Sequence, residues 1–252
     1  MTVPTYLPYV VLTGNALTLI AILYGLNRAL ADAAWPTQER MRALGLSAAI
    51  LLGWLAVAIG LSGAGFYHVT AGGIPTIQYG LLFPILIVVL LIWRSKLARR
   101  MLEAVPQPWL VGVQFYRALG VVFLILYAAG HLPALFAWPA GVGDIAIGLS
   151  APIVAYAYAR APRENAGAVR TWNVLGILDL VIAVTTGFLT APSLIAPFEF
   201  HPSSELITVL PMVMIPVYLV PLSIVLHIAS LVKLHREQAC ASGCKQMAHA
   251  PA

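Results

Sequence analysis

Three ionisable side chains lie inside long apolar runs of the sequence, and they are the residues best suited to do chemistry. They are Arg117, Asp144 and Asp179. A charged group at the centre of a membrane helix costs about 2.5 to 3.5 kcal/mol on insertion scales, so it normally faces a protein interior and has a partner. Each of the three lies on a helical stripe of small residues, which lets a neighbouring backbone approach and excludes lipid. We therefore interpret them as the centre of a polar interior.

The elements that must position these groups are membrane-spanning helices. Of the 252 residues, 61% are hydrophobic and 9% are charged, whereas soluble domains carry about 25% charged residues. Several apolar runs reach the roughly 20 residues that cross the hydrocarbon as a helix, which is too long for the strands of a barrel. The sequence therefore predicts an all-α polytopic membrane protein surrounded by the lipid bilayer.

Seven apolar segments are long enough to cross a bilayer. We predict spans at about 7–30, 43–66, 75–93, 109–130, 138–159, 171–190 and 208–233. Indole rings favour the headgroup layer, and four tryptophans fall at the predicted span ends. These are Trp93, Trp109, Trp138 and Trp172.

The basic residues predict the orientation of the chain. Thirteen of the fourteen Lys and Arg residues follow odd-numbered spans, and the predicted loops at 67–74, 131–137 and 191–207 contain none. By the positive-inside rule the N-terminus is outside and the C-terminus is cytoplasmic. Since this topology accounts for the net charge of +5, we expect no nucleic-acid partner.

The predicted membrane domain covers residues 1–234, and a cytoplasmic tail, predicted to be disordered, covers 235–252. In this tail Cys240 and Cys244 are four residues apart, which is a weak metal-binding pattern. Between spans three and four, the basic segment 94–108 has a Pro-Gln-Pro break and is predicted to lie at the membrane interface.

A faint internal repeat has a constant offset of 127 residues. Ala56, Val57 and Gly60 match Ala183, Val184 and Gly187, and Pro75 and Pro84 match Pro202 and Pro211. Spans two and three would then echo spans six and seven in the same orientation, a parallel three-one-three arrangement of the kind found in some sugar transporters. Because apolar sequences also match by chance, a chance origin stays open.

Depth along the helices, at about 1.5 Å per residue, predicts two polar layers. Arg117, Asp179 and His227 lie at similar distances from the predicted cytoplasmic span ends and form an inner layer. Asp144 belongs to an outer layer, which also contains the polar residues of the first and third spans. The full set of predicted interior residues is Arg117, Asp179, His227, Gln114, Asn173, Asp144, Asn15, Gln78 and Tyr79.

Two interpretations of these layers stay open. In the functional interpretation they are the inner and outer stations of a polar pathway or pocket. In the structural interpretation Arg117 and Asp179 form an ion pair that fixes helix register, and Asp144 bonds to backbone. Both predict that Arg117 and Asp179 are in direct or water-bridged contact.

The positions of the histidines do not identify a cofactor. A bis-histidine haem needs two histidines at one depth, and His227 is alone in the inner half. His68, His131 and His201 could gather outside the membrane with Glu199 or Glu205 and bind a metal, but no paired ligand spacing supports this site. None of the three lysines lies in the interior of a predicted span, since Lys233 is the last residue of the seventh, so a retinal Schiff base has no attachment point.

Two phrases, GHLPALFAWPAGVGDIAIG at 130–148 and RTWNVLGILDL at 170–180, resemble a group of small bacterial inner-membrane proteins with no established activity. The resemblance covers roughly residues 105–233. It rests on the Gln114–Arg117 pair, on Pro139 to Asp144 and on Trp172 to Asp179. It implies a bacterial plasma membrane and carries no function over to this chain.

Three hypotheses about function come from different classes. The leading one is a carrier or conduit for a small solute or proton through the polar interior, and it is favoured over enzyme activity. The second is a membrane-embedded enzyme or cofactor-binding protein that acts on a lipid or quinone-like molecule. The third is a structural or assembly partner. The sequence specifies neither a ligand nor an oligomeric state.

Overall fold

The computed structural model describes residues 4–194, 196 and 198–248, and within these ranges it contains helices and no strand. An isolated bridge joins Gly73 to Ser193. The helices are α1 (Leu7–Asp32), α2 (Thr37–Gly63), α3 (Ile77–Arg94), α4 (Lys96–Ala104), α5 (Gln107–Gly112), α6 (Val121–Ala128), α7 (Ala134–Arg160), α8 (Pro162–Leu189) and α9 (Val220–Ala248). The 3₁₀ helix η1 (Val113–Gly120) joins α5 to α6, and the 3₁₀ turn η2 (Glu205–Thr208) and π-helical turn η3 (Ile215–Leu219) precede α9.

The prediction of seven spans in an all-α membrane protein is confirmed. Seven helical segments are long and apolar enough to cross a bilayer, with α5, η1 and α6 forming the fourth and η3 opening the seventh. The predicted edges differ most at the sixth span, where α8 begins at Pro162 and not at residue 171. Only Ala161 separates α7 from α8, so the basic residues assigned to a loop there belong to helix.

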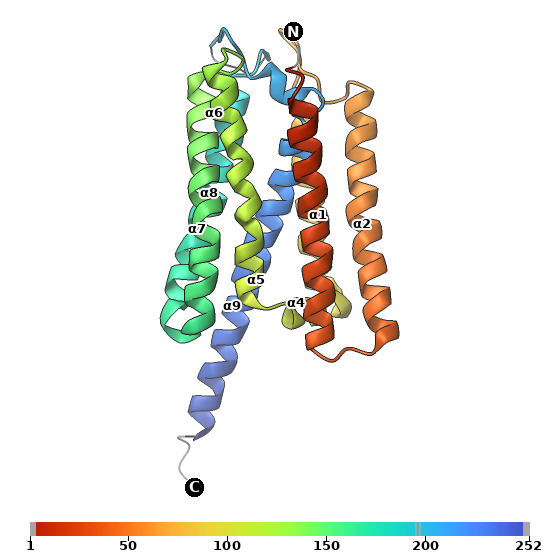
Figure 1. Cartoon of the computed structure of the whole chain (residues 1–252), viewed down its shortest axis with the longest axis vertical. Helices are drawn as coiled ribbons and strands as arrows, with labels where there is room; N and C mark the ends of the chain where they lie inside the picture. The colour runs from red at the N-terminus through yellow and green to blue at the C-terminus, as the bar shows by residue number, and fades with distance from the viewer. Residues whose placement is uncertain (1–3, 195, 197, 249–252) are drawn as a thin grey trace.

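The two ends of the bundle differ in composition. The α1–α2 turn, α4, the α7–α8 junction and the C-terminal part of α9 lie at one end, which we call the basic end, and the N-terminus lies at the other (Figure 1). The basic end gathers the positively charged residues that follow odd-numbered spans. Its assignment to the cytoplasm stays a prediction from the positive-inside rule.

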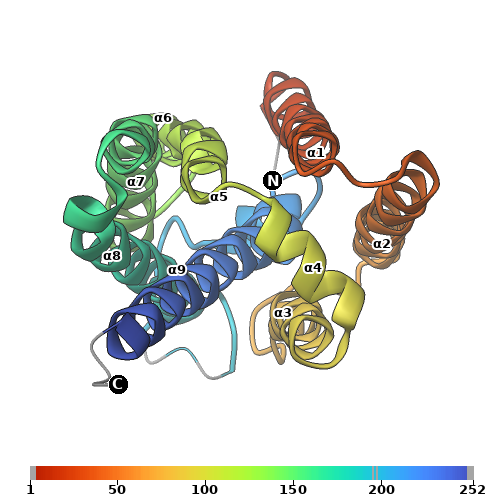
Figure 2. The same ribbon diagram turned by 90° about the horizontal axis from the view of Figure 1, so that it is seen from below.

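The predicted interfacial segment contains α4, which crosses the base of the bundle (Figure 2). The Ser95 side chain caps α4 by accepting a hydrogen bond from the Ala98 amide at 3.2 Å. Arg100 binds Glu39 at 3.1 Å and lies 4.6 Å from the centre of the Trp35 ring. These contacts fix α4 against the start of α2.

α9 is the axis of the fold (Figure 2). α7 packs against α8 and against the whole fourth span, and α8 and α5 pack against α9. α3 contacts α9 and η3 from the other side, while α2 contacts mainly α1 and η3. Because the fourth span is part of one packed group, it is not a separate linker between two groups of three, and the sequence repeat stays a prediction.

Two features of the span ends depart from expectation. Trp172 is 6% exposed and its ring centre lies 5.1 Å from that of His227, so its predicted place in the headgroup layer is wrong. α9 continues to Ala248, through most of the segment predicted as a disordered tail. The side chains of Cys240 and Cys244 lie outside the described part of the chain.

Candidate functional site

Arg117 is the centre of the polar interior. Its Nε donates to Asp144 Oδ1 at 2.8 Å, and its Nη2 lies 2.7 Å from the same oxygen and also donates to Asp179 Oδ2. Its Nη1 donates to the Gly176 carbonyl at 3.2 Å and contacts His227 Nε2 at 3.2 Å. A guanidinium has five N–H donors. Four of them make these hydrogen bonds, and Nη2 forms a close ion pair with Asp144 as well.

The two carboxylates each keep one oxygen free. Asp144 contacts Arg117 through Oδ1 and Asp179 contacts it through Oδ2, and no other described group donates to either side chain. Their side chains are 15% and 14% exposed, against 2% for Arg117. The cluster therefore has one cation and two carboxylates, and one oxygen of each carboxylate receives no hydrogen bond from the described residues.

The predicted contact between Arg117 and Asp179 is confirmed, and the separate outer layer for Asp144 is wrong. The error comes from the span edges. Counted from the observed ends at Ala128, Ala134 and Leu189, the three residues lie eleven, ten and ten residues from the N-terminal end of the bundle. At about 1.5 Å per residue this is one depth, near 15 Å.

The other members of the predicted outer layer do not reach the cluster. Asn15 is buried and donates to the Val11 carbonyl at 2.8 Å. Gln78 donates to the Pro75 carbonyl at 2.7 Å. Tyr79 is 50% exposed, so its predicted place in the interior is wrong. No outer station is formed by these residues.

Glycines let the helices approach closely enough for the cluster to form. A Cβ at any of four positions would overlap the cluster or the backbone that carries it. These overlaps are Gly120 with Asp144, Gly143 with Asp179, Gly148 with the Arg117–Ala118 backbone and Gly176 with His227. The small-residue stripes noted in the sequence therefore provide the space in which the charged side chains meet.

A chain of hydrogen bonds leads from the cluster toward the basic end. Arg117 can only donate, so His227 accepts at Nε2 and its proton is on Nδ1, which lies 2.9 Å from Asn173 Oδ1. Asn173 Nδ2 donates to Ser230 Oγ at 2.8 Å, and Gln107 Nε2 donates to the same oxygen at 2.6 Å. These bonds hold the imidazole neutral and fix its orientation against the guanidinium.

Several residues around the cluster were not predicted from the sequence. The Trp172 indole donates to Ser150 Oγ at 2.9 Å, and the Tyr116 and Ser223 hydroxyls are 2.6 Å apart. Gln107 lies seven residues before Gln114, which is itself fully buried. That spacing on one helical face was the signal that could have identified Gln107.

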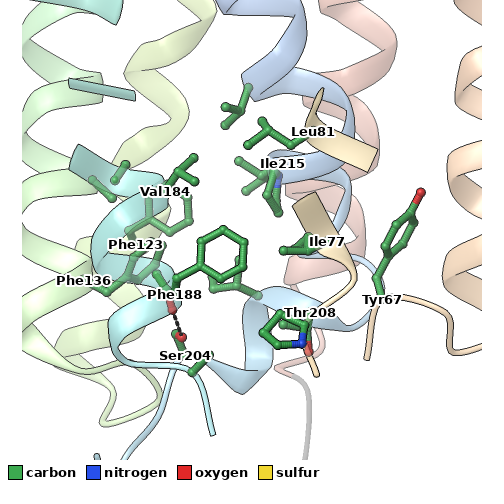
Figure 3. Close-up of a pocket in the computed structure, with 18 of the residues that line it drawn as sticks. Tyr67, Ile77, Leu81, Phe123, Phe136, Val184, Phe188, Ser204, Thr208 and Ile215 are labelled. Atoms are coloured by element: carbon green, nitrogen blue, oxygen red, sulfur yellow. Dashed lines mark hydrogen bonds between the residues drawn. The ribbon is translucent and has the colours of Figure 1, made fainter. Parts of the chain in front are cut away.

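A narrow cavity of about 70 Å³ leads from the loops at the N-terminal end to Asp144. Figure 3 shows Phe123, Phe136, Val184 and Phe188 on one side and Ile77, Leu81 and Ile215 on the other. The hydroxyls of Ser204 and Thr208 at its outer part donate to backbone carbonyls, each at 2.8 Å. A second cavity of about 40 Å³ reaches Arg117 and Asp144 from the α1 side.

Among the described residues, Asp144 is the only charged side chain that lines the narrow cavity. Tyr67 contributes to the wall from the loop after α2, and burial raises the pKa of its phenol above the usual value. Of the predicted outer histidines, His68 pairs with Glu205 at 2.9 Å. Among the described residues, no group of three or more His, Cys, Asp or Glu is placed to hold a metal ion.

A profile of a known protein family matches residues 74–235, which are 162 of the 252 residues. The chain belongs to the DUF8737 family, a domain of unknown function. No curated protein and no solved structure matches the chain. The DUF8737 region contains the whole Arg117 cluster and leaves α1 and α2 outside.

Proposed function

We propose that this DUF8737 protein is a carrier or conduit for protons or small cations, with Asp144 and Asp179 as the binding groups. The observation that carries the proposal is the unequal charge of the cluster, in which one guanidinium is shared by two carboxylates. With both carboxylates ionised, the bundle holds a net negative charge about 15 Å from one end. Buried charge of this kind is costly, so a proton or a cation is expected to balance it.

The geometry favours a cation over an anion. Four of the five donors of Arg117 make hydrogen bonds within the cluster, and its Nη2 also pairs closely with Asp144, so the buried guanidinium is poorly placed to receive an anionic ligand. Each carboxylate still has one oxygen that can take a proton or contact a cation. Arg117 thus acts as a fixed counter-charge that keeps the two carboxylates together.

Access to the site is unequal from the two ends. The cavity leads to Asp144 from the N-terminal end, whereas the side chains of His227, Asn173 and Ser230 close the basic side. Release to that side therefore requires a rearrangement. The non-α segments η1 and η3 lie beside the cluster and the cavity, and such segments often mark hinges. On the positive-inside assignment the cavity faces outside, in a bacterial plasma membrane.

The test is flux into proteoliposomes followed with a pH-sensitive dye and with sodium- and potassium-sensitive dyes. We expect Asp144→Asn and Asp179→Asn to lower the rate at least tenfold, because each removes the excess negative charge. The matched control is Asp32→Asn, an exposed aspartate at the end of α1. Wild-type flux no greater than that of empty vesicles, or unchanged flux in both cluster variants, would remove the proposal.

A second candidate is a membrane-embedded protein that acts on a lipid or quinone-like molecule. The observation that favours it is the apolar wall of the cavity, to which three phenylalanines contribute. It predicts a lipid or a coloured compound that stays bound through purification. Solvent extraction with mass spectrometry, together with a visible absorption spectrum, would detect either one.

A further inference from the structure

The cavity and the cluster together specify a class of ligand. We propose that the cavity binds a slender organic cation, with an alkylammonium-type head at the free oxygen of Asp144 and an apolar chain along the cavity. This deepens the proposed function, because the same carboxylate would then take either a proton or the head of the organic cation. The binding step itself can be tested without any assay of transport.

The charge of the head follows from the hydrogen bonds at the inner end of the cavity. Asp144 lines the cavity, and its Oδ2 receives no hydrogen bond from the described residues. Arg117 is only 2% exposed and its guanidinium is held by two carboxylates, so it is not available to a carboxylate or phosphate head. A donor with positive charge is therefore the complementary head group, and a charge-assisted hydrogen bond to Asp144 is stronger than a neutral one.

The shape of the tail follows from the walls. From Asp144 to Phe136 is eight residues along α7, or about 12 Å of helix. Along this length the cavity is lined by apolar side chains from α3, α6, α8 and η3, among them Leu81, Phe123 and Ala183. A small volume of about 70 Å³ spread over this distance favours a slender, extended chain as the tail.

Competition with protons follows from the shared site. The ammonium head binds ionised Asp144, and protonation of this carboxylate removes the attraction. Apparent affinity should therefore fall as the pH falls, by up to tenfold per pH unit where one proton competes. Exchange of one proton for one organic cation keeps the cluster charge unchanged, which is the stoichiometry expected of an exchanger.

The experiment measures binding of three ligands of equal chain length to the purified full-length protein in detergent. The ligands are n-hexylammonium, n-hexanol and n-hexanoate, and the dissociation constants come from thermal-shift titration and calorimetry. We expect the cation to bind at least tenfold more tightly than the alcohol and the anion to show no binding. Asp144→Asn should abolish the preference for the cation, and the control Asp32→Asn should keep it.

A second variant separates the cavity from the charge. Ala183→Phe fills the cavity wall and leaves the three charged residues in place, so it should weaken binding of both hexylammonium and hexanol. Equal binding of all three ligands, or a preference for the cation that survives Asp144→Asn, would overturn the inference. Proton flux that depends on Asp144 without hexylammonium binding would overturn it while leaving the proposed function intact. Hexylammonium binding that depends on Asp144, without any proton or cation flux, would support the inference and remove the proposed function.

Discussion

The two sides of the bundle differ in how tightly their helices approach one another. On the cluster side α7, α8 and the fourth span meet at glycines, and 28%, 22% and 44% of their most apolar parts are buried. On the other side α1 is 39% buried, whereas the figures for α2 and α3 are only 6% and 11%. Four glycines of α2 have no neighbouring atom within 4 Å of an added Cβ. They are Gly45, Gly53, Gly60 and Gly63.

This contrast shows where the protein can hold charge. A guanidinium and two carboxylates are tolerated only where close packing excludes lipid and supplies partners. The DUF8737 match covers the whole cluster side and omits α1 and α2. Two polar residues of α1 and α3 that were predicted to lie in the interior, Asn15 and Gln78, bond to nearby backbone on their own segments. The charged chemistry is thus confined to the cluster side.

The largest expected effect comes from removing Arg117, the cation that the two carboxylates of the cluster share. Arg117→Met strands two carboxylates, and removing one partner from a buried pair typically costs about 3 to 5 kcal/mol. Asp144→Asn or Asp179→Asn leaves a one-to-one pair and should cost less than about 1.5 kcal/mol, the range of one hydrogen bond. Thermal and denaturant unfolding in detergent would measure the difference.

A triple variant tests whether Arg117, Asp144 and Asp179 act as one coupled unit. Adding Asp144→Leu and Asp179→Leu to Arg117→Met removes both stranded charges, and we expect the triple variant to recover much of the lost stability. If the losses in the triple variant simply add, the three residues are not one coupled unit. The unequal-charge argument for function would then lose its support.

The glycines provide a matched comparison between the two sides. Gly143→Ala and Gly176→Ala place a methyl group on Asp179 and on His227, and overpacking of this kind costs about 1 to 3 kcal/mol. Gly53→Ala and Gly60→Ala in α2 meet open space, so the helix propensity of alanine should leave stability unchanged or raise it by up to about 1 kcal/mol. Melting temperatures of the four variants measure this, and equal losses would contradict the contrast.

The sequence predicted the spans well because the length of an apolar run is a local property. It predicted contact between Arg117 and Asp179 because opposite charges in an apolar interior need each other. It failed on Asp144 because depth was counted from span edges. The edge of α7, which carries Asp144, lies at Ala134, four residues before the predicted start, and the edge of α8, which carries Asp179, lies at Pro162, nine residues before. A single residue between two helices leaves little loop signal in the sequence.

The cavity and the full set of Arg117 contacts could not be predicted. Both depend on how side chains from distant segments fit together, as where Gly143 admits Asp179 and Gly176 admits His227. The sequence showed small residues beside the charges but not which neighbour each one receives. The hydrogen bond from Gln107 to Ser230 likewise joins segments 123 residues apart.

The smallest expected effect concerns the attachment of α2. Trp54 Nε1 donates to the Val217 carbonyl at 3.1 Å, and its ring centre lies 4.6 Å from that of Tyr218. Trp54→Phe keeps an aromatic ring and removes this hydrogen bond to η3, so it should cost about 0.5 to 1.5 kcal/mol. Trp93→Phe, at a position that is 74% exposed, is the control and should cost less.

Flux is the more informative measurement for Trp54→Phe. If α2 only braces η3 from outside, the proteoliposome rate should equal that of wild type even though the melting temperature falls. The carbonyl of Val217 lies in the π-helical turn η3. In Trp54→Phe this carbonyl loses its hydrogen-bond donor, which alters the turn that also contains the cavity residues Ile215 and Pro216. A rate that falls several-fold in Trp54→Phe but not in Trp93→Phe would therefore show that α2 controls η3. In that case α2 would affect flux together with the cluster side, and the functional contrast between the two sides would not include α2.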